Sequence, residues 1–405
     1  MKYVIILGDG MADEPLEELG GNTPLYTANT PCMDSLAGVS EIGLVHTIPE
    51  GMKPGSDTAN LAVLGYNPKQ YYTGRSPLEA LSIGVDMKET DIALRCNLVT
   101  LSEGGDYETK TMLDHSSSEI TTEDAAVLIA AVKQELENEI YQYYVGTSYR
   151  HLTIWDGGNV VDLTPPHDIL GKMVNEYLPT DAKLREMMKK SFAILNEHPL
   201  NIERARKGLN KANSIWFWGA GTRPALDSFF EKTGKRGAMI SAVDLLKGIA
   251  VGAKMKVIDV EGADGTLHTN YAGKAKAAVK ALNEDGFDFA YVHVEAPDEM
   301  GHQGNINNKI QSIEYLDQEV IRVIKEEMEQ AGAEYRMLIL PDHPTPIAKR
   351  THTADPVPYM LYDSRKTERF SHHYNEREAA NSGHSIEKGY QMIEYLFGNV
   401  EHLKE

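Results

Sequence analysis

Short runs of β-branched and aromatic residues alternate with longer amphipathic stretches through most of this 405-residue chain. We expect strands at 3–7, 92–101, 151–156, 214–219, 238–241, 256–260, 289–295 and 337–341. We expect helices at 122–142, 181–195, 225–232, 242–253, 271–284, 305–331 and 385–397. Strands separated by helices of ten or more residues are typical of βαβ units. The pattern therefore predicts an α/β fold with a mostly parallel sheet flanked by helices.

The segment 84–230 differs from the sequence on either side of it. It contains all three tryptophans, Trp155, Trp216 and Trp218, and none of the carboxylate–histidine pairs described below. A chain of this length is expected to form two or three domains. We therefore predict an inserted α+β domain at 84–230, and one discontinuous core formed by 1–83 and 231–405.

Acidic residues outnumber basic residues by 60 to 40, which gives a net charge of −20. This excess argues against general binding to nucleic acids or anionic membranes, because such binding needs surplus cations. An anionic substrate would need a local positive group, such as a metal ion. With two cysteines and no apolar run long enough to span a membrane, the chain is expected to be cytoplasmic.

Residue types that bind metals follow three of the predicted strands. In parallel α/β sheets, ligands bind beyond the carboxyl ends of the strands, so these positions are candidates for a common site. The candidate ligands are Asp9, Asp298, His302, Asp342, His343 and His352. A competing interpretation is that Asp9 and Asp298 only cap helices and that the histidines are ordinary loop residues.

The spacing of Asp298 and His302 favours the metal interpretation. Side chains at positions i and i+4 project from one side of a helical turn, so both can reach one ion. Asp9, Asp342 and His343 would then hold a second ion. Mixed carboxylate and imidazole ligands favour Mn²⁺ or Zn²⁺, with Mg²⁺ possible.

A candidate nucleophile, Ser56, lies in the sequence Pro-Gly-Ser-Asp-Thr-Ala-Asn at 54–60. Ser56 would begin a helix whose N-terminal amides favour a phosphoryl group. Two divalent ions are suited to in-line displacement at phosphorus, and a metal-bound serine alkoxide is reactive at neutral pH. The alternative interpretation is that Ser56 or Asp57 only caps this helix.

Together these motifs resemble those of the metal-dependent alkaline phosphatase superfamily. They are Gly-Asp-Gly around Asp9, GSDTANLAVLGYNP with YYTGRSPLEAL, VEAPDEMGH, and PDHPTP with HTADPVP. Within the superfamily they are most similar to the short, archaeal-type branch of the cofactor-independent phosphoglycerate mutases. The resemblance extends over nearly the whole chain and implies an alkaline phosphatase-like core with a cap domain.

The resemblance also implies individual roles. It assigns Asp9, Ser56, Asp342 and His343 to one metal ion, with Ser56 as the residue that carries the phosphoryl group. It assigns Asp298, His302 and His352 to the other ion. His384 and the pair His372–His373 have no ligand motif around them, so we expect them at the surface or behind the ligands.

In such mutases the cap domain supplies groups that bind the phosphorylated metabolite. Candidates in the insert are Arg95, Asn97, Arg150, Asp168 and Arg223, and candidates from the core are Arg75 and Lys235. The sequence evidence for each of these candidates is weak by itself, because arginine and lysine are common at protein surfaces.

One segment departs from the family. Where these mutases have an arginine-rich stretch of the type DRRAGR, this chain has Asp-His-Ser-Ser-Ser-Glu at 114–119. Fewer guanidiniums suit a less anionic substrate. The leading interpretation is interconversion of 2- and 3-phosphoglycerate through a phosphoserine at Ser56. A homoserine kinase-like phosphotransferase with the same two-metal core is the alternative, and the role of His115 stays open.

Overall fold

The computed structural model describes residues 1–400, which form two compact units. The core unit comprises residues 1–72 and 225–400, and the insert comprises residues 73–224. The insert thus begins and ends earlier than the predicted 84–230. The N-terminal boundary differs because helix α5 (Arg75–Ser82) packs on strands of the insert. Hydrogen bonds from Thr73 to Thr222 and from Ser76 to Gly219 anchor this end of the insert.

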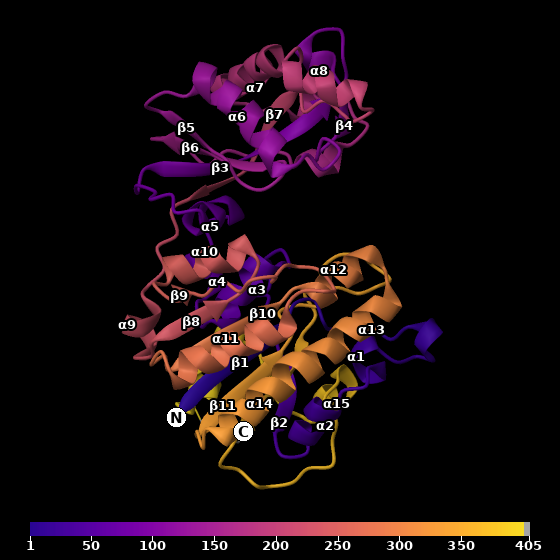
Figure 1. Cartoon of the computed structure of the whole chain (residues 1–405), viewed down its shortest axis with the longest axis vertical. Helices are drawn as coiled ribbons and strands as arrows, with labels where there is room; N and C mark the ends of the chain where they lie inside the picture. Colours follow the sequence, from indigo (N-terminus) through magenta and orange to yellow (C-terminus); the bar gives the residue numbers. More distant parts are fainter. Residues whose placement is uncertain (401–405) are drawn as a thin grey trace. The chain divides into compact units, whose positions relative to one another are not determined.

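The core unit is built on an eight-stranded sheet with the order β13-β2-β12-β11-β1-β10-β8-β9 (Figure 1). Its strands are β1 (Lys2–Gly8), β2 (Glu41–Val45), β8 (Gly237–Ile240), β9 (Lys256–Val257), β10 (Phe289–Val294), β11 (Tyr335–Leu340), β12 (Val357–Asp363) and β13 (Ser385–Ile386). Within residues 1–400, β12 alone runs antiparallel to its neighbours in this sheet. The predicted α/β fold with a mostly parallel sheet is confirmed.

Helices cover both faces of this sheet. They are α1 (Pro24–Thr27), α2 (Pro31–Ala37), α3 (Ser56–Val63), α4 (Pro68–Tyr71), α9 (Phe229–Thr233), α10 (Asp244–Gly252), α11 (Tyr271–Asn283), α12 (Ala296–Gln303), α13 (Ile306–Tyr315), α14 (Arg322–Gln330), α15 (Glu376–Asn381) and α16 (Met392–Phe397). Short 3₁₀ turns lie at Glu17–Leu19 and Gly389–Gln391. The helix predicted at 385–397 is wrong in its first half, because Ser385–Ile386 pairs with β2 as a strand.

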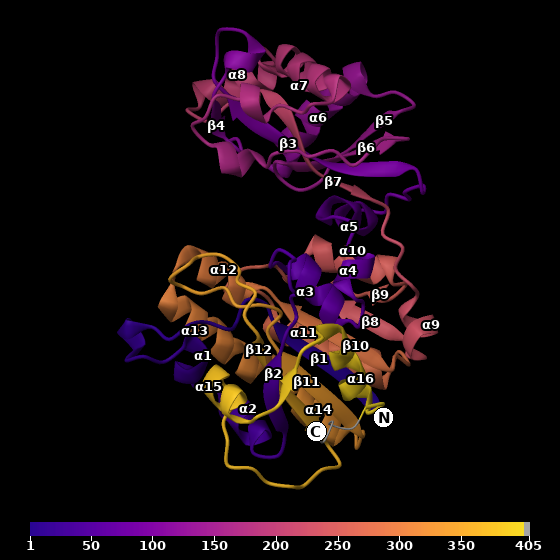
Figure 2. The same ribbon diagram turned by 180° about the vertical axis from the view of Figure 1, so that it is seen from behind.

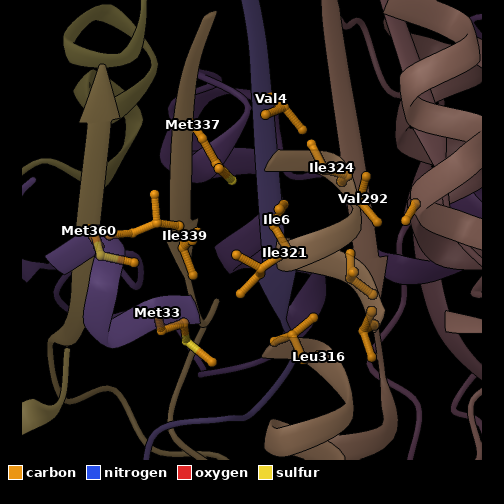
Figure 3. Close-up of a cluster of buried hydrophobic side chains, with 14 of the residues drawn as sticks. Val4, Ile6, Met33, Val292, Leu316, Ile321, Ile324, Met337, Ile339 and Met360 are labelled. Carbon is orange, nitrogen blue, oxygen red and sulfur yellow. The ribbon is translucent and has the colours of Figure 1, made fainter. Parts of the chain in front are cut away.

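One face of the sheet packs against α2, α11 and α14 (Figure 1). Val4 and Ile6 alternate along β1 and point to this face, because side chains of a strand alternate between the two faces. Figure 3 shows them with Ile321 and Leu316. Each fully buried aliphatic side chain of this kind contributes about 1.5–3 kcal/mol to the stability of the fold.

The other face carries α3, α10 and α16; Figure 2 shows α16 from this side. Here the rings of Tyr3 and Phe397 meet edge to face, with centroids 4.9 Å apart. Tyr291 on β10 donates a hydrogen bond to Asn60 of α3. These contacts hold the helix that begins with Ser56 against the sheet.

The helix predicted at 305–331 forms as one helical run with a π-helical turn, Leu316–Ile321, between α13 and α14. Buried residues recur every four positions along it, at 312, 316, 320, 324 and 328. An ideal α-helix turns about 40° too far in every four residues to keep such a row on one side. The wider π turn absorbs part of this drift and keeps the row against the sheet.

The insert is an α+β unit with a five-stranded antiparallel sheet. Its strands are β3 (Asp91–Leu101), β4 (Met112–Asp114), β5 (Tyr141–Tyr144), β6 (Arg150–Asp156) and β7 (Ser214–Thr222). Its other helices are α6 (Thr122–Leu136), α7 (Ala182–Leu195) and α8 (Pro199–Arg206), with 3₁₀ turns at Tyr107–Thr109, Pro166–Ile169 and Asn175–Tyr177. Leu94 and Cys96 on β3 pack against α6 and α7 in its core. Within residues 1–400, no helix is both long enough and apolar enough to cross a bilayer.

Candidate metal centre

Six predicted ligand side chains gather in the core unit, just beyond the carboxyl ends of β1, β10 and β11. Ligand atoms of Asp9, Asp342 and His343 all lie within 4.8 Å of one another, and so do those of Asp298, His343 and His352. His302 Nε2 lies 3.2 Å from Asp298 Oδ2 and 3.0 Å from His352 Nε2. The two groups correspond to the two predicted ligand sets, with His343 near both.

Gly10 explains why the loop after β1 can reach the other ligands. Its φ of +59° lies in the left-handed region that favours glycine. A Cβ at this position would lie 2.5 Å from Thr345 Oγ1 and 2.6 Å from Asp298 Oδ1. The missing side chain therefore lets Asp9 lie beside the groups that follow β10 and β11.

Ser56 is the first residue of α3 and lies beside the first group. Its Oγ is 3.1 Å from His343 Nε2, and 3.5 and 3.4 Å from the two carboxylate oxygens of Asp9. The hydroxyl thus lies where an ion held by Asp9 and His343 would also contact it. The amide of Thr58 already donates to Asp57 Oδ1, so the amides of Ser56 and Asp57 are the ones at the start of α3 that favour an anion.

The electrostatics of the cluster suit a cation. Burial and the nearby charges of Asp342 and Asp298 raise the pKa of Asp9 well above its ordinary value. Burial opposes ionisation of Asp298 as well, but hydrogen bonds from His302 and His352 outweigh it and hold the pKa of Asp298 well below normal. Several carboxylates buried together repel one another, and divalent ions would neutralise them. Carboxylate and imidazole donors fit Mn²⁺ or Zn²⁺ better than Ca²⁺.

Three neutral residues that the sequence analysis missed hold the carboxylates. His293 Nε2 lies 2.9 Å from Asp9 Oδ2, and Asn60 Nδ2 donates to Asp342 Oδ2 at 2.9 Å. Thr345 Oγ1 donates to Asp298 Oδ1 at 2.5 Å. Burial lowers the pKa of His293 to about 3, which keeps this imidazole neutral. A signal existed for two of them, since His293 and Asn60 are polar residues inside otherwise apolar segments.

Two predicted substrate-binding residues of the insert are held by neighbours in the insert. Arg95 is 7% exposed and forms an ion pair with Glu79, with Nη2 2.8 Å from Oε1. Its guanidinium also lies 4.4 Å from the centroid of the Trp218 ring, and Trp218 Nε1 donates to Asn97 Oδ1. Arg95 and Asn97 therefore belong to one packed group.

The remaining predicted residues of the insert lie at its surface. Arg150, Asp168, Arg223 and Arg75 are exposed. Arg75 was expected from the core, but it belongs to α5 of the insert and forms an ion pair with Glu79.

The segment 114–119 forms an unusual turn close to Trp218. Ser117, Ser118 and Glu119 have φ values of 51°, 59° and 48°, which are strained for residues with side chains. The Asp114 carboxylate accepts hydrogen bonds from the amides of Ser116 and Ser118 and so holds the turn.

His115, at the start of this segment, has its ring centroid 6.1 Å from that of His167. The ring of His167 is in turn 5.4 Å from that of Trp218. The imidazoles of His115 and His167 thus lie next to each other, with His167 beside Trp218.

Lys235 is a corrected prediction. Its Nζ lies 5.5 Å from the ring centroids of Tyr3 and Phe397. Tyr3 is at the start of β1, whereas Asp9 follows the end of that strand, about 20 Å away at the rise of an extended chain. Lys235 therefore lies near the N-terminal ends of the parallel strands, whereas Ser56 lies near their carboxyl ends, and Lys235 does not reach Ser56.

The histidines without a ligand motif lie outside the cluster. His372 Nε2 bonds to the carbonyl of Ser40, and His373 pairs with Asp34. His384 is exposed beside Gly43 of β2.

The sequence of this chain is similar to those of known proteins. The family model for 2,3-bisphosphoglycerate-independent phosphoglycerate mutase matches residues 37–201. A probable enzyme of this name from Geobacter sulfurreducens is 46% identical, over 98% of this chain and 99% of that protein. The enzyme from Methanosarcina barkeri is 47% identical, over 95% of this chain and 96% of that protein.

Two solved structures are similar over nearly their whole length. A protein from Pyrococcus horikoshii has a TM-score of 0.81 at 29% identity, covering 100% of this chain and 99% of that one. The cofactor-independent phosphoglycerate mutase from Thermoplasma acidophilum has a TM-score of 0.66 at 26% identity, covering 99% and 100%. With relatives this similar over almost every residue, the chain belongs to the family of 2,3-bisphosphoglycerate-independent phosphoglycerate mutases.

Proposed function

We propose that this chain interconverts 2- and 3-phosphoglycerate by way of a phosphoserine at Ser56. The observation that carries the proposal is the position of Ser56 Oγ, which lies within 3.1–3.5 Å of His343 and Asp9. A hydroxyl beside two buried ligand side chains, at the start of a helix, is suited to receive a phosphoryl group. A soluble metabolite of this kind also fits a cytoplasmic location.

Two divalent ions are part of the proposal, with Mn²⁺ or Zn²⁺ favoured and Mg²⁺ possible. Asp9, Asp342 and His343, with Ser56, would hold one ion, and Asp298, His302 and His352 the other. Their donor atoms are the carboxylates and imidazoles that these ions accept. When bound, such ions supply positive charge that favours the serine alkoxide and offsets the charge on the phosphoryl oxygens.

The reaction is then two successive displacements at phosphorus. Ser56 Oγ loses its proton and attacks, the Oγ–P bond forms, and the bond from phosphorus to the glycerate oxygen breaks. The released glycerate oxygen takes a proton. After the glycerate turns, its other hydroxyl loses its proton and attacks the phosphoserine, the new O–P bond forms, the Oγ–P bond breaks, and Ser56 Oγ takes a proton back. Amides at the start of α3 donate to the phosphoryl oxygens in both steps.

We further propose that the insert binds the glycerate and excludes water, because a phosphoserine open to water would be hydrolysed. Arg150 and Arg223 are exposed and suited to the carboxylate or phosphate. Arg95, which is paired with Glu79, would orient Trp218 and Asn97 instead. Asp168 and the imidazoles of His115 and His167 complete the candidate groups.

The test is conversion of 3-phosphoglycerate to 2-phosphoglycerate by the metal-loaded protein, followed by mass spectrometry of Ser56. Ser56→Ala should lower turnover by about a thousandfold or more and remove the phosphoserine. Ser385→Ala, on edge strand β13, is the matched control and should behave as the unaltered protein. Undiminished turnover by Ser56→Ala would refute the mechanism.

The homoserine kinase-like alternative is tested in the same assay with ATP and homoserine. The absence of an arginine-rich stretch at 114–119 motivates this arm, whereas the mutase names of the relatives support phosphoglycerate. Phosphohomoserine formed faster than 2-phosphoglycerate would favour the alternative substrate.

A further inference from the structure

A chain of three hydrogen bonds leads from the backbone of Val243 to the carboxylate of Asp9. The amide of Val243 donates to Ser241 Oγ at 3.0 Å. Ser241 Oγ lies 3.2 Å from His293 Nδ1, and His293 Nε2 lies 2.9 Å from Asp9 Oδ2. His293 is completely buried, and Ser241 and Asp9 are nearly so. Water therefore does not compete for these bonds.

The chemistry of each group sets the direction of the chain. A carboxylate that binds a metal ion is ionised and only accepts hydrogen bonds, so with an ion bound to Asp9 the proton between the two side chains belongs to His293 Nε2. In a neutral imidazole this leaves Nδ1 as an acceptor. Ser241 Oγ already accepts from the Val243 amide, and its own proton is then available to Nδ1. Each donor in this chain of hydrogen bonds, from the Val243 amide to His293 Nε2, therefore has an acceptor.

We infer that His293 and Ser241 are positioning residues that hold Asp9 in the orientation needed to bind a metal ion. The inference rests on the proposed function, because it takes Asp9 as a ligand. His293 occupies Oδ2 of Asp9, while Oδ1 lies 3.5 Å from His343 Nε2. Ser56 Oγ is almost equidistant from the two oxygens, 3.5 Å from Oδ1 and 3.4 Å from Oδ2. Fixing one oxygen leaves the other turned toward the remaining ligands.

A second line from the same strand supports the inference. Tyr291 and His293 are two residues apart on β10, so their side chains lie on the same face of the sheet. Tyr291 donates to Asn60 Oδ1, and Asn60 Nδ2 donates to Asp342 Oδ2. One strand thus supports a carboxylate of β1 directly and a carboxylate of β11 through Asn60.

The donors on both lines are neutral, and this matters for a metal site. A lysine or arginine in the same place would satisfy the carboxylate with its own charge and compete with the ion. A neutral imidazole or amide fixes the oxygen and leaves the negative charge for the ion. Neutral donors of this kind orient the carboxylates of Asp9 and Asp342 without forming ion pairs with them.

The experiment measures Mn²⁺ binding to the metal-free full-length protein by titration calorimetry and electron paramagnetic resonance. His293→Leu should weaken the affinity of one of two ions by about 10–100-fold, which is the usual effect of removing such a partner. His293→Gln, which can still donate to Asp9, should recover part of this loss. Ser241→Ala should weaken binding less than His293→Leu.

Ser191→Ala is the matched control. Ser191 is a buried serine of the insert that accepts from the amide of Ile215 and donates to the carbonyl of Met188. Its removal costs hydrogen bonds of the same kinds as removal of Ser241, without any link to Asp9. It should lower stability and leave Mn²⁺ affinity unchanged.

Nitrogen NMR of the unaltered protein, labelled at histidine and loaded with Zn²⁺, gives a readout that does not depend on the folding of variants. The resonances of His293, identified by their loss in His293→Gln, should show a protonated Nε2 and an unprotonated Nδ1. A proton on Nδ1 would overturn the inference, and so would unchanged Mn²⁺ affinity in His293→Leu. Failure of the unaltered protein to bind Mn²⁺ would instead contradict the proposed function itself.

Discussion

Lys309 and Asp13 form an ion pair in the interior of the core unit, with Nζ 2.8 Å from Oδ2 and neither side chain exposed. Lys309 Nζ also donates to the carbonyls of Ala12 and Thr345. These carbonyls belong to the loops that follow β1 and β11, the same loops that carry Asp9 and His343. Lys309 therefore links the loop that carries Asp9 to the loop that carries His343.

Lys309→Met should destabilise the core unit by about 3–5 kcal/mol, because it leaves the Asp13 carboxylate buried without a counter-charge. The double variant Asp13→Asn/Lys309→Met should be more stable than the sum of the two single variants predicts, since it removes both charges. Urea unfolding of the metal-free proteins measures both effects. Strict additivity of the two single changes would show that the pair is not coupled.

Gly10→Ala should disrupt the metal centre, whereas Gly20→Ala should not. Both glycines have φ values near +60°, so both substitutions carry a backbone cost of about 1–2 kcal/mol. The Cβ introduced by Gly10→Ala would in addition collide with Thr345 and Asp298, while the one introduced by Gly20→Ala meets nothing within 4 Å. Mn²⁺ titration should therefore show weaker binding in Gly10→Ala alone. Equal affinities in the two variants would contradict the packing argument.

Metal binding should become tighter as the pH rises toward 9. The hydrogen bond to Asp298 raises the pKa of His302 to about 9 in the metal-free protein. An ion needs the neutral imidazole, so binding below this pH must release the proton. Calorimetry in buffers of different ionisation enthalpy should detect proton release at pH 7, and His302→Gln should reduce it.

The same proton stabilises the metal-free fold. The folded-state pKa of His302 lies above its unfolded value of 6.5, so this stabilisation is complete below about pH 6.5 and disappears as the pH rises through 9. Urea midpoints in the presence of EDTA should fall over this range, and less so in His302→Gln. A midpoint that rises with pH between 7 and 9 would contradict the assigned direction.

Arg95 and Arg150 should respond differently to replacement by methionine. Arg95→Met removes the buried partner of Glu79, which keeps only the ion pair with the exposed Arg75, and should destabilise the insert by about 1.5–3 kcal/mol, as for a lost hydrogen bond to a charged group. Arg150→Met changes an exposed residue and should alter stability by less than about 0.5 kcal/mol. If Arg150 binds the substrate anion, the KM of this variant should rise about tenfold, as expected for one charge-assisted hydrogen bond. Equal losses of stability in the two variants would contradict this distinction.

Much of the candidate centre follows from local sequence. Asp9, Asp298 and Asp342 each come shortly after an apolar strand, and parallel strands bring their carboxyl ends to one edge. His293 and Asn60 could not be found in this way, because they lie inside a strand and a helix and act across the fold. Lys235 was predicted to contact the substrate from its charge alone. It precedes the start of β8, so it lies at the end of the strands opposite to the ligands.

The elements that sequence missed depend on distant partners. Strand β13 has two residues and was read as the start of a helix, yet it pairs with β2 more than 300 residues earlier in the chain. Strand β12 follows a proline-rich loop and runs against its neighbours, so it breaks the alternation on which the prediction relied. Contacts of α5 with β3 and β7 likewise set the start of the insert. No local pattern encodes these contacts.

The number of residues in the helical run from α13 to α14 decides whether Lys309 of α13 faces Asp13 near the candidate metal centre. The π turn at Leu316–Ile321 accommodates about one residue more than an α-helix of the same rotation, so deleting one residue there would leave α13 and α14 nearly in phase, whereas deleting one residue from α14 would rotate α13 by about 100°. With α14 anchored on the sheet, Lys309 would then swing away from Asp13. A one-residue deletion in α14, far from any ligand in sequence, should therefore be tolerated less well than one in the π turn.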